Sequence, residues 1–455
     1  MPRATPSRQT TTPTTQKLQN RQKDPVNPID LTSKPAPAER TWTTPDVFWP
    51  ALSMATARLD PAFGVLHLPA LRHNAHDMLR RAGGSPERPG KAIRVASKSV
   101  RVRSVLDAVL ALPGYAGVLA YTLPEALWLA EGDAGHPPIE DVVVGYPTAD
   151  RGAIARLAAS PELAARVTLM VDSVAHLDLI DAVVPPAERE TIRLCLELDS
   201  SWDAPVLGHV GVYRSPLHSV AAVREVAEAI VRRPGFALVG MMGYEAQIAG
   251  QGDNPPGRPA WGATLRWMQK SSQEELLARR GEAVATVRSL ADLEFVNGGG
   301  TGSLEFTASD PSVTEIAAGS GLFGGHLFDT YRGFRPAPAA SFALSVVRRP
   351  DERTATLLGG GWIASGPPGP DRLPKIEWPT GLSMVDREMA GEVQTPVTGA
   401  AAGILRVGDR VWLRHTKSGE LSEHVDDFHL VDVVEGRAAV VGTVPSYRGE
   451  GKVFL

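Results

Sequence analysis

The sequence predicts an α/β protein with a (β/α)8 barrel over residues 60–335, followed by a C-terminal all-β domain over residues 336–455. Two patterns predict this architecture. Up to about residue 335, short and almost continuously apolar runs alternate with helical segments, which is typical of parallel strands covered on both faces. After that point, short β-type runs are separated by Gly and Pro turns, which indicates an antiparallel domain.

Eight strand-and-helix units follow from Ile93 onward, and this number favours a closed barrel. A doubly wound sheet usually carries its glycine-rich loop after the first strand, whereas the richest glycine loop of this chain comes late. The predicted barrel strands are residues 93–96, 117–120, 141–145, 167–171, 192–198, 236–242, 293–297 and 314–317. Helices are predicted over residues 102–112, 123–131, 220–232 and 273–290, and β-domain strands over 341–348, 354–358, 391–394, 410–414, 430–434 and 438–441.

The composition bounds the functional classes. The 455 residues are 43% hydrophobic and carry a net charge of −4, so we expect a globular chain without the basic field that attracts nucleic acid or an anionic membrane. Residues 1–40 are rich in Thr, Pro, Gln and Arg, and we expect a disordered tail there, with a transit peptide as the alternative. A single cysteine, Cys195, excludes a disulfide framework, and no apolar run has the length of a membrane span. The cytoplasm is the expected compartment.

Lys98 ends the apolar run of the first predicted barrel strand, between two serines. An amine held at a strand end, and partly shielded from water, is what Schiff-base chemistry requires. Taken alone, the position is equally typical of a solvated lysine that opens a helix.

A glycine-rich loop, residues 297–303, follows the seventh predicted barrel strand. Its backbone N–H groups, together with hydroxyl groups, suit a phosphate, although a merely flexible loop would have the same composition. The candidate phosphate-binding residues are Gly299, Gly300, Thr301 and Gly302, with Gly319 and Ser320 after the next strand. In a barrel, this loop and Lys98 meet at one mouth, which is the arrangement that pyridoxal phosphate needs.

Two further strand ends carry candidate residues. Tyr244 follows the sixth predicted strand and is expected at the barrel mouth, either beside a ligand or as packing. The segment from Glu197 to Arg214 places acids, His209 and an arginine after the fifth strand, which suits an anionic or zwitterionic ligand.

The chain resembles the fold-type III pyridoxal-phosphate enzymes, which include alanine racemase, D-threonine aldolase and D-serine dehydratase. The resemblance extends from about residue 45 to the C-terminus, and within that group it is greatest to the bacterial amino acid deaminase/aldolase proteins. The segments that carry it are residues 94–101, 243–250, the glycine loop, 391–396 and 447–452.

The resemblance implies roles for the candidate residues. Lys98 would bind the cofactor covalently, the glycine loop and Gly319–Ser320 would hold its phosphate, and Tyr244 would lie beside its ring. Either His209 or Arg214 would face the pyridine nitrogen. It also implies that the strand at 63–67 joins the β domain and that two chains form a head-to-tail homodimer.

The resemblance implies a lyase that cleaves or deaminates a β-hydroxy D-amino acid. Three alternatives stay open: an amino acid racemase, a non-catalytic pyridoxal-phosphate-binding regulator, and a phosphate-binding barrel without a Schiff base. The long β domain argues against the regulator, since the small relatives with that role consist of the barrel alone.

The chain departs from its relatives at the metal site. D-threonine aldolases and D-serine dehydratases hold a divalent metal through a C-terminal His-x-Asp or His-x-Cys pair, but the matching region, residues 444–449, has neither. We therefore predict no metal ligands and interpret His424, Asp426 and His429 as a polar surface turn. One hypothesis is that a cation from residues 414–417, such as His415, replaces the metal.

Overall fold

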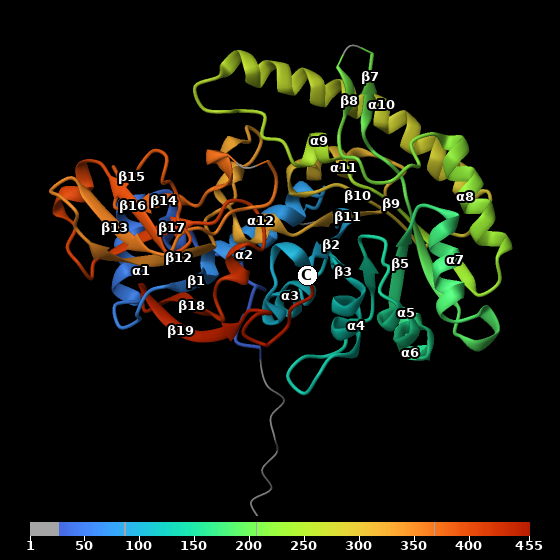
Figure 1. The fold of residues 1–455 in the computed structure, drawn as a ribbon, viewed down its shortest axis with the longest axis horizontal. Coiled ribbons are helices and arrows are strands. Elements are labelled where there is room, and N and C mark those ends of the chain that lie inside the picture. The colour runs from blue at the N-terminus through green and yellow to red at the C-terminus, as the bar shows by residue number, and fades with distance from the viewer. Residues whose placement is uncertain (1–26, 86–87, 206, 368) are drawn as a thin grey trace, which may run out of the picture.

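The computed structural model describes residues 27–85, 88–205, 207–367 and 369–455. Its two parts are a barrel and a mostly antiparallel sheet that lie side by side (Figure 1). Within the described residues, eight parallel strands close the barrel, so the fold class predicted from the sequence is confirmed. In chain order these strands are β2 (Ala92–Ala96), β3 (Tyr115–Ala120), β4 (Val142–Val144), β5 (Val167–Val171), β6 (Ile192–Glu197), β9 (Phe236–Gly243), β10 (Phe295–Gly298) and β11 (Glu315–Ala318).

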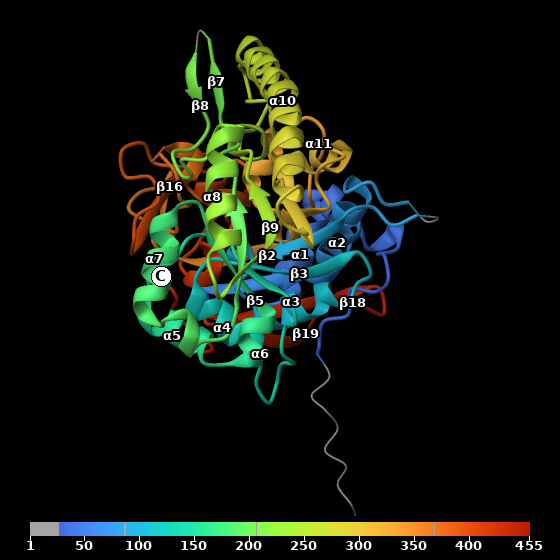
Figure 2. The same ribbon diagram turned by 90° about the vertical axis from the view of Figure 1, so that its right-hand side faces the viewer.

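The barrel closes between β11 and β2, where Ile316 pairs with Ile93 and Ala318 with Val95. Helices surround the closed sheet (Figure 2). They are α2 (Leu68–Arg81), α3 (Arg103–Leu110), α4 (Leu123–Glu131), α5 (Arg151–Ala158), α6 (Pro161–Arg166), α7 (Val174–Val183), α8 (Val220–Arg232), α10 (Pro259–Arg288), α11 (Leu304–Ser309) and α12 (Ser320–Phe323). Strand residues that face these helices belong to the main apolar core, which gives every barrel strand two buried faces.

The interior of the barrel has its own core. Alternate strand residues build an apolar cluster of Val143, Met170, Cys195, Val239, Met242 and Phe295. Next to it lies a buried ion pair, in which Arg94 Nε donates to Glu315 Oε1 at 2.6 Å. Asn297 donates to the same oxygen at 2.9 Å, and Asp141 accepts from Arg94 at 2.8 Å. Arg94 and Glu315 come from the two strands whose pairing closes the barrel.

The second part is a nine-stranded sheet in which β1 (Phe63–His67) lies between β12 and β18, outside the barrel. Its other strands are β12 (Ala340–Arg348), β13 (Thr354–Leu358), β14 (Lys375–Trp378), β15 (Ser383–Met384), β16 (Gln394–Thr398), β17 (Arg410–Arg414), β18 (Asp427–Val434) and β19 (Arg437–Pro445). Helix α1 (Pro45–Ala55), which the sequence analysis does not predict, covers this sheet with Phe48, Trp49 and Leu52.

Two predicted elements have other bounds in the structure. The strand expected at 391–394 begins only at Gln394, because Thr395 and Val397 are the residues buried in the sheet. Helix α10 begins at Pro259, 14 residues before the predicted start at 273, and its first half projects from the barrel beside the hairpin of β7 (Trp202–Ala204) and β8 (Gly208–Val210) (Figures 1 and 2).

The predicted N-terminal tail is only partly described. Residues 1–26 lie outside the described residues. Residues 27–40 pack against the protein, because Ile29 and Leu31 are buried and Arg72 Nε donates to Asp30 O at 2.8 Å. Ile29 and Leu31 are thus apolar residues of the predicted tail that pack against the rest of the protein. No helix in the described part of the chain has the length and apolar character needed to cross a membrane.

Removal of the buried arginine tests the contribution of the ion pair inside the barrel. Arg94→Met is expected to lower the free energy of unfolding by about 3–5 kcal/mol, because it leaves the Glu315 carboxylate buried without its cation. Arg193→Met is the matched control, since its partner Glu294 is half exposed and the loss should be at most about 1 kcal/mol. Urea unfolding measures both, and equal losses would contradict the prediction.

Candidate active site at the barrel mouth

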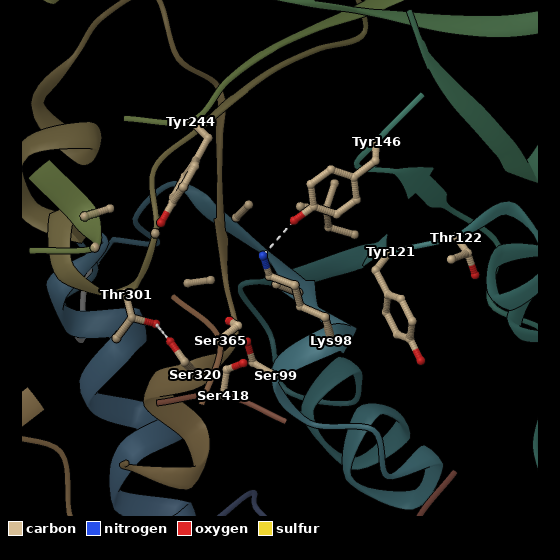
Figure 3. A pocket seen from close by; sticks show the side chains of 18 of the residues that line it. Lys98, Ser99, Tyr121, Thr122, Tyr146, Tyr244, Thr301, Ser320, Ser365 and Ser418 are labelled. Carbon is tan, nitrogen blue, oxygen red and sulfur yellow. Dashed lines mark hydrogen bonds between the residues drawn. The ribbon is translucent and has the colours of Figure 1, made fainter. Parts of the chain in front are cut away.

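A cavity of about 780 Å³ lies at the carboxyl ends of the barrel strands. Residues that follow β2, β4, β9, β10 and β11 line it, and the β domain adds Ser365, Lys417 and Ser418 from the side (Figure 3). Of the ten predicted site residues, eight line this cavity: Lys98, Arg214, Tyr244, Gly299, Gly300, Thr301, Gly319 and Ser320.

Lys98 points into the middle of this cavity (Figure 3). Its Nζ donates a hydrogen bond to the Tyr146 hydroxyl at 2.7 Å. Tyr146 follows strand β4 just as Lys98 follows β2, so the ends of two strands on either side of β3 hold the pair. No acidic partner of Lys98 is found in the described part of the chain, which leaves its amine available to a ligand.

The backbone around Lys98 is fixed by local contacts. Strand β2 runs into one helical turn, Ser97–Ser99, and the buried Ser97 donates from Oγ to Leu119 O at 3.2 Å. Arg101 has a left-handed backbone (φ 52°), and its Nε donates back to Lys98 O at 3.0 Å. Gly419 of the β domain approaches Lys98 O so closely that any Cβ there would collide with it. The lysine therefore stands on a rigid support.

The glycine loop is held from below by a fully buried carboxylate, Glu245. It accepts hydrogen bonds from Gly299 N at 3.0 Å and from Thr307 Oγ1 at 2.5 Å. Arg280 lies 3.3 Å from the same carboxylate and also pairs with the buried Asp310 at 2.7 Å. The Gly299 amide, which the sequence analysis counted toward the phosphate site, is thus used to attach the loop to Glu245.

The cavity-facing part of the loop joins the turn after β11 through hydroxyl groups. Ser320 Oγ donates to Thr301 Oγ1 at 3.0 Å (Figure 3), and Gly321 N donates to the same oxygen at 3.1 Å. Both residues begin short helical turns, whose first N–H groups have no intrahelical acceptor. Hydroxyls and backbone N–H groups therefore converge here in the pattern suited to a phosphate. Gly302 does not line the cavity; it lies against Ala249 and Tyr331.

Tyr244 lies against this loop. A Cβ at Gly300 would be 3.2 Å from Tyr244 Cε2 and 2.9 Å from Ala249 Cβ, so the absence of a side chain leaves room for the ring. Burial raises the pKa of Tyr244 to about 12, with Arg214 opposing the shift, so the phenol stays protonated at neutral pH.

Arg214 and His209, the two candidates for the pyridine-nitrogen partner, lie in different places. Arg214 lies 5.4 Å from the Tyr244 ring centre and 5.7 Å from that of Tyr146, at the cavity. His209 lies outside the cavity, on the projecting hairpin, where Nδ1 is 3.1 Å from Asp203 and its ring stacks on Tyr213. The structure therefore corrects the inclusion of His209, because the β7–β8 hairpin separates it from the barrel mouth.

The structure places His415, the residue considered as a cationic replacement for the metal, away from the cavity. His415 is buried outside the cavity, and burial lowers its pKa to about 4, which leaves it neutral at pH 7. Arg414 pairs with Asp329 and Glu377 at 3.1 and 3.2 Å. Of this segment, Lys417 is the charged residue that lines the cavity.

Two of the residues considered as metal ligands contact other side chains instead. His424 stacks on Trp362 with ring centres 4.9 Å apart, and Asp426 pairs with Arg448 at 2.9 Å. Within the described ranges, no group of three His, Cys, Asp or Glu residues is arranged to hold a metal ion.

The sequence analysis did not single out Tyr146, which lines the cavity, or Glu197, a buried acid whose charge interacts with that of Arg214. Tyr146 follows a predicted strand and could have been found by the rule that located Lys98 and Tyr244. Glu197 was noted only as part of a charged run. It is buried at the end of β6, and burial together with Asp172 raises its pKa to about 7, with Arg214 opposing.

Known proteins with a similar sequence or fold were compared with the chain. No family model matches it. Over 260 residues, it is 28% identical to 3-hydroxy-D-aspartate aldolase of Paracoccus denitrificans, which covers 57% of this chain and 59% of that protein. A second aldolase of the same name, from strain Pd 1222, is 26% identical over 267 residues. The chain therefore spans about three fifths of the length of these curated relatives.

Solved structures match more of the chain. D-threonine aldolase from Filomicrobium marinum has a TM-score of 0.67 at 18% identity, covering 88% of this chain and 97% of that one. D-threo-3-hydroxyaspartate dehydratase from Delftia sp. HT23 has a TM-score of 0.61 at 18% identity, covering 85% and 97%. The chain has the fold of the fold-type III enzymes. The resemblance read from the sequence motifs is thereby confirmed at the level of the fold.

Loss of the Glu245 charge tests how the glycine loop is held. Glu245→Gln is expected to weaken the affinity for pyridoxal phosphate about tenfold, because the amide cannot accept from Gly299 N, Thr307 and Arg280 together. The control is Glu282→Gln, an exposed site on the same helix as Arg280. Equilibrium titration of both variants with the cofactor checks this, and equal affinities would contradict the assigned role of Glu245.

Proposed function

We propose that this protein is a pyridoxal-phosphate-dependent lyase that cleaves or deaminates a β-hydroxy D-amino acid. One observation carries the proposal: the Lys98 amine and the Thr301–Ser320 hydroxyls, which follow adjacent strand ends of the closed barrel, face the same cavity (Figure 3). An amine and a phosphate-type cradle in one cavity match the two ends of pyridoxal phosphate.

The residues present fit this cofactor. The cradle is free of side chains at Gly300 and Gly319, and at Gly319 an added Cβ would collide with Ala96 O. Arg214 is a cation beside the two tyrosine rings and has no ion-pair partner in the described part of the chain. A cationic neighbour of the pyridine nitrogen disfavours protonation of that nitrogen, and this protonation state influences which reaction the cofactor supports.

The chain's own residues can hold and move a proton next to the substrate. When bound, pyridoxal phosphate would supply the electron withdrawal that weakens bonds at the substrate's Cα. The Tyr146 hydroxyl accepts from Lys98 Nζ and keeps its own proton to donate, so it both orients the amine and offers a proton path. The β domain narrows the mouth with Ser365 and Ser418, which limits access of water.

The relatives support the reaction class. The names of two similar proteins describe an aldolase and a dehydratase that act on hydroxylated D-amino acids, which supports a small amino acid as substrate. A head-to-tail homodimer and a cytoplasmic location are part of this proposal and follow from the resemblance and the composition. A divalent metal is not part of it, because the chain lacks the ligand pair of the metal-using relatives.

Covalent trapping tests the cofactor link. After incubation with pyridoxal phosphate and borohydride reduction, mass spectrometry is expected to find the cofactor on the peptide that contains Lys98. Lys98→Ala should lose this adduct and the visible absorption band, whereas Lys375→Ala, a β-domain surface variant, should keep both. A trapped adduct on another lysine would contradict the assignment.

Replacement of the tyrosine beside Lys98 tests the proton path. Tyr146→Phe is expected to lower kcat on the order of 100-fold with a smaller change in KM, because it removes the hydroxyl that contacts Nζ. Tyr213→Phe, at a fully exposed ring on the hairpin, serves as the control. An unchanged kcat in Tyr146→Phe would exclude that role.

A substrate panel decides the reaction class. Incubation with D-threonine, D-serine and 3-hydroxy-D-aspartate is expected to yield glycine with an aldehyde, or a keto acid with ammonia. Interconversion of D- and L-alanine without these products would identify a racemase and overturn the lyase proposal.

A further inference from the structure

The cavity holds more positive charge than the proposed cofactor site uses. Among the described residues that line it are four cationic side chains, Lys98, Arg101, Arg214 and Lys417, and one acidic side chain, Asp150. Arg101 is paired with Glu423, and Lys98 and Arg214 already have roles toward the cofactor. Lys417 is the cation that remains unassigned, and it forms no ion pair with any described residue.

Lys417 is presented by a rigid loop of the β domain. The loop follows β17, and Glu420 accepts from the backbone N of Lys417 at 2.7 Å and of Ser418 at 2.8 Å. The next residue, Gly419, packs directly against Lys98 O. The β domain thus places Lys417 at the cavity that Lys98 also lines.

A second cation, Arg372, lies behind Lys417. Its side chain is 16% exposed, and the Nε and Nη1 atoms are buried without a hydrogen-bond partner. The nearest carboxylate, Asp371, is 3.6 Å from Nε, which is beyond hydrogen-bond distance. Thr416 donates to Arg372 O at 3.0 Å and so connects this residue to the Lys417 loop. Asp371 is thus an ion-pair partner of Arg372 but accepts no hydrogen bond from it. Buried Nε and Nη1 groups without an acceptor are unfavourable, and an anion bound nearby would offset this cost.

The neighbours of Lys417 indicate which anion it binds. The pKa of Lys417 is lowered by burial and by the positive charges of Arg372, Lys98 and Arg214. Its ammonium group therefore interacts electrostatically with the residues around the Lys98 amine. In an amino acid, the carboxylate lies two bonds from the amine that replaces Lys98. A cation that binds this carboxylate must therefore lie close to Lys98, whereas the phosphate has its own cradle at Thr301 and Ser320.

We propose that Lys417, with Arg372 behind it, binds the α-carboxylate of the amino acid substrate. This inference rests on the proposed function, since it assumes that an amino acid joins the cofactor at Lys98. It makes the β domain a part of the substrate site. The cation and the cofactor-binding lysine come from different parts of the fold, so the relative placement of barrel and sheet determines which amino acids fit.

The test compares two amines that differ in the carboxylate. D-Alanine and isopropylamine both react with the cofactor but lack a β-hydroxyl group, and each is titrated into the holoenzyme while the visible band is followed. Lys417→Met is expected to weaken D-alanine binding at least about tenfold and isopropylamine binding less than about twofold. Lys417→Arg should keep D-alanine binding within about threefold, because it retains the charge. Lys375→Met, on the β-domain surface, should change neither.

The outcomes separate this inference from the proposed function. Equal weakening of both amines in Lys417→Met, or a lower affinity for the cofactor itself, would overturn the carboxylate role. Unchanged D-alanine binding would overturn it as well. A wild-type protein that develops no visible band with pyridoxal phosphate would overturn the proposed function and this inference together.

Discussion

Closure of the barrel between its first and last strands is the constraint on which the site depends. Strands β2 and β11 are more than 200 residues apart in the chain, yet Val95 pairs with Ala318. This pairing places Lys98, just after β2, beside the Gly319–Ser320 turn, just after β11. A parallel sheet that stayed open would leave these two strand ends at opposite edges.

The closing strands are also joined by charge. Arg94 of β2 and Glu315 of β11 pair inside the barrel. Each lies two positions before a residue of the same strand that lines the cavity, Ala96 on β2 and Ala317 on β11. A second buried carboxylate, Glu245, holds the glycine loop. Negative groups thus lie beneath the site as structural supports, while most of the charged side chains that line the cavity are cationic. This separation suits a ligand with several anionic groups.

The β domain contributes to the site as well as to the fold. Its loop at Lys417–Gly419 contacts the Lys98 backbone, and Ser365 and Ser418 narrow the mouth. The structural relatives cover most of the chain, whereas the sequence relatives align over 57% of it, so the common architecture is retained across a large divergence in sequence.

The sequence by itself determined the eight barrel strands, the positions of Lys98, Tyr244 and the glycine loop after strand ends, and the change to an all-β domain. These follow from local patterns, because apolar runs and glycine-rich turns report on the residues next to them. Only the tertiary structure placed Arg214 at the cavity and His209 outside it, showed that the Gly299 amide is used by Glu245, and brought Lys417 and Tyr146 to the cavity of Lys98. Those outcomes depend on contacts between segments far apart in the chain, for which a single sequence carries no local signal.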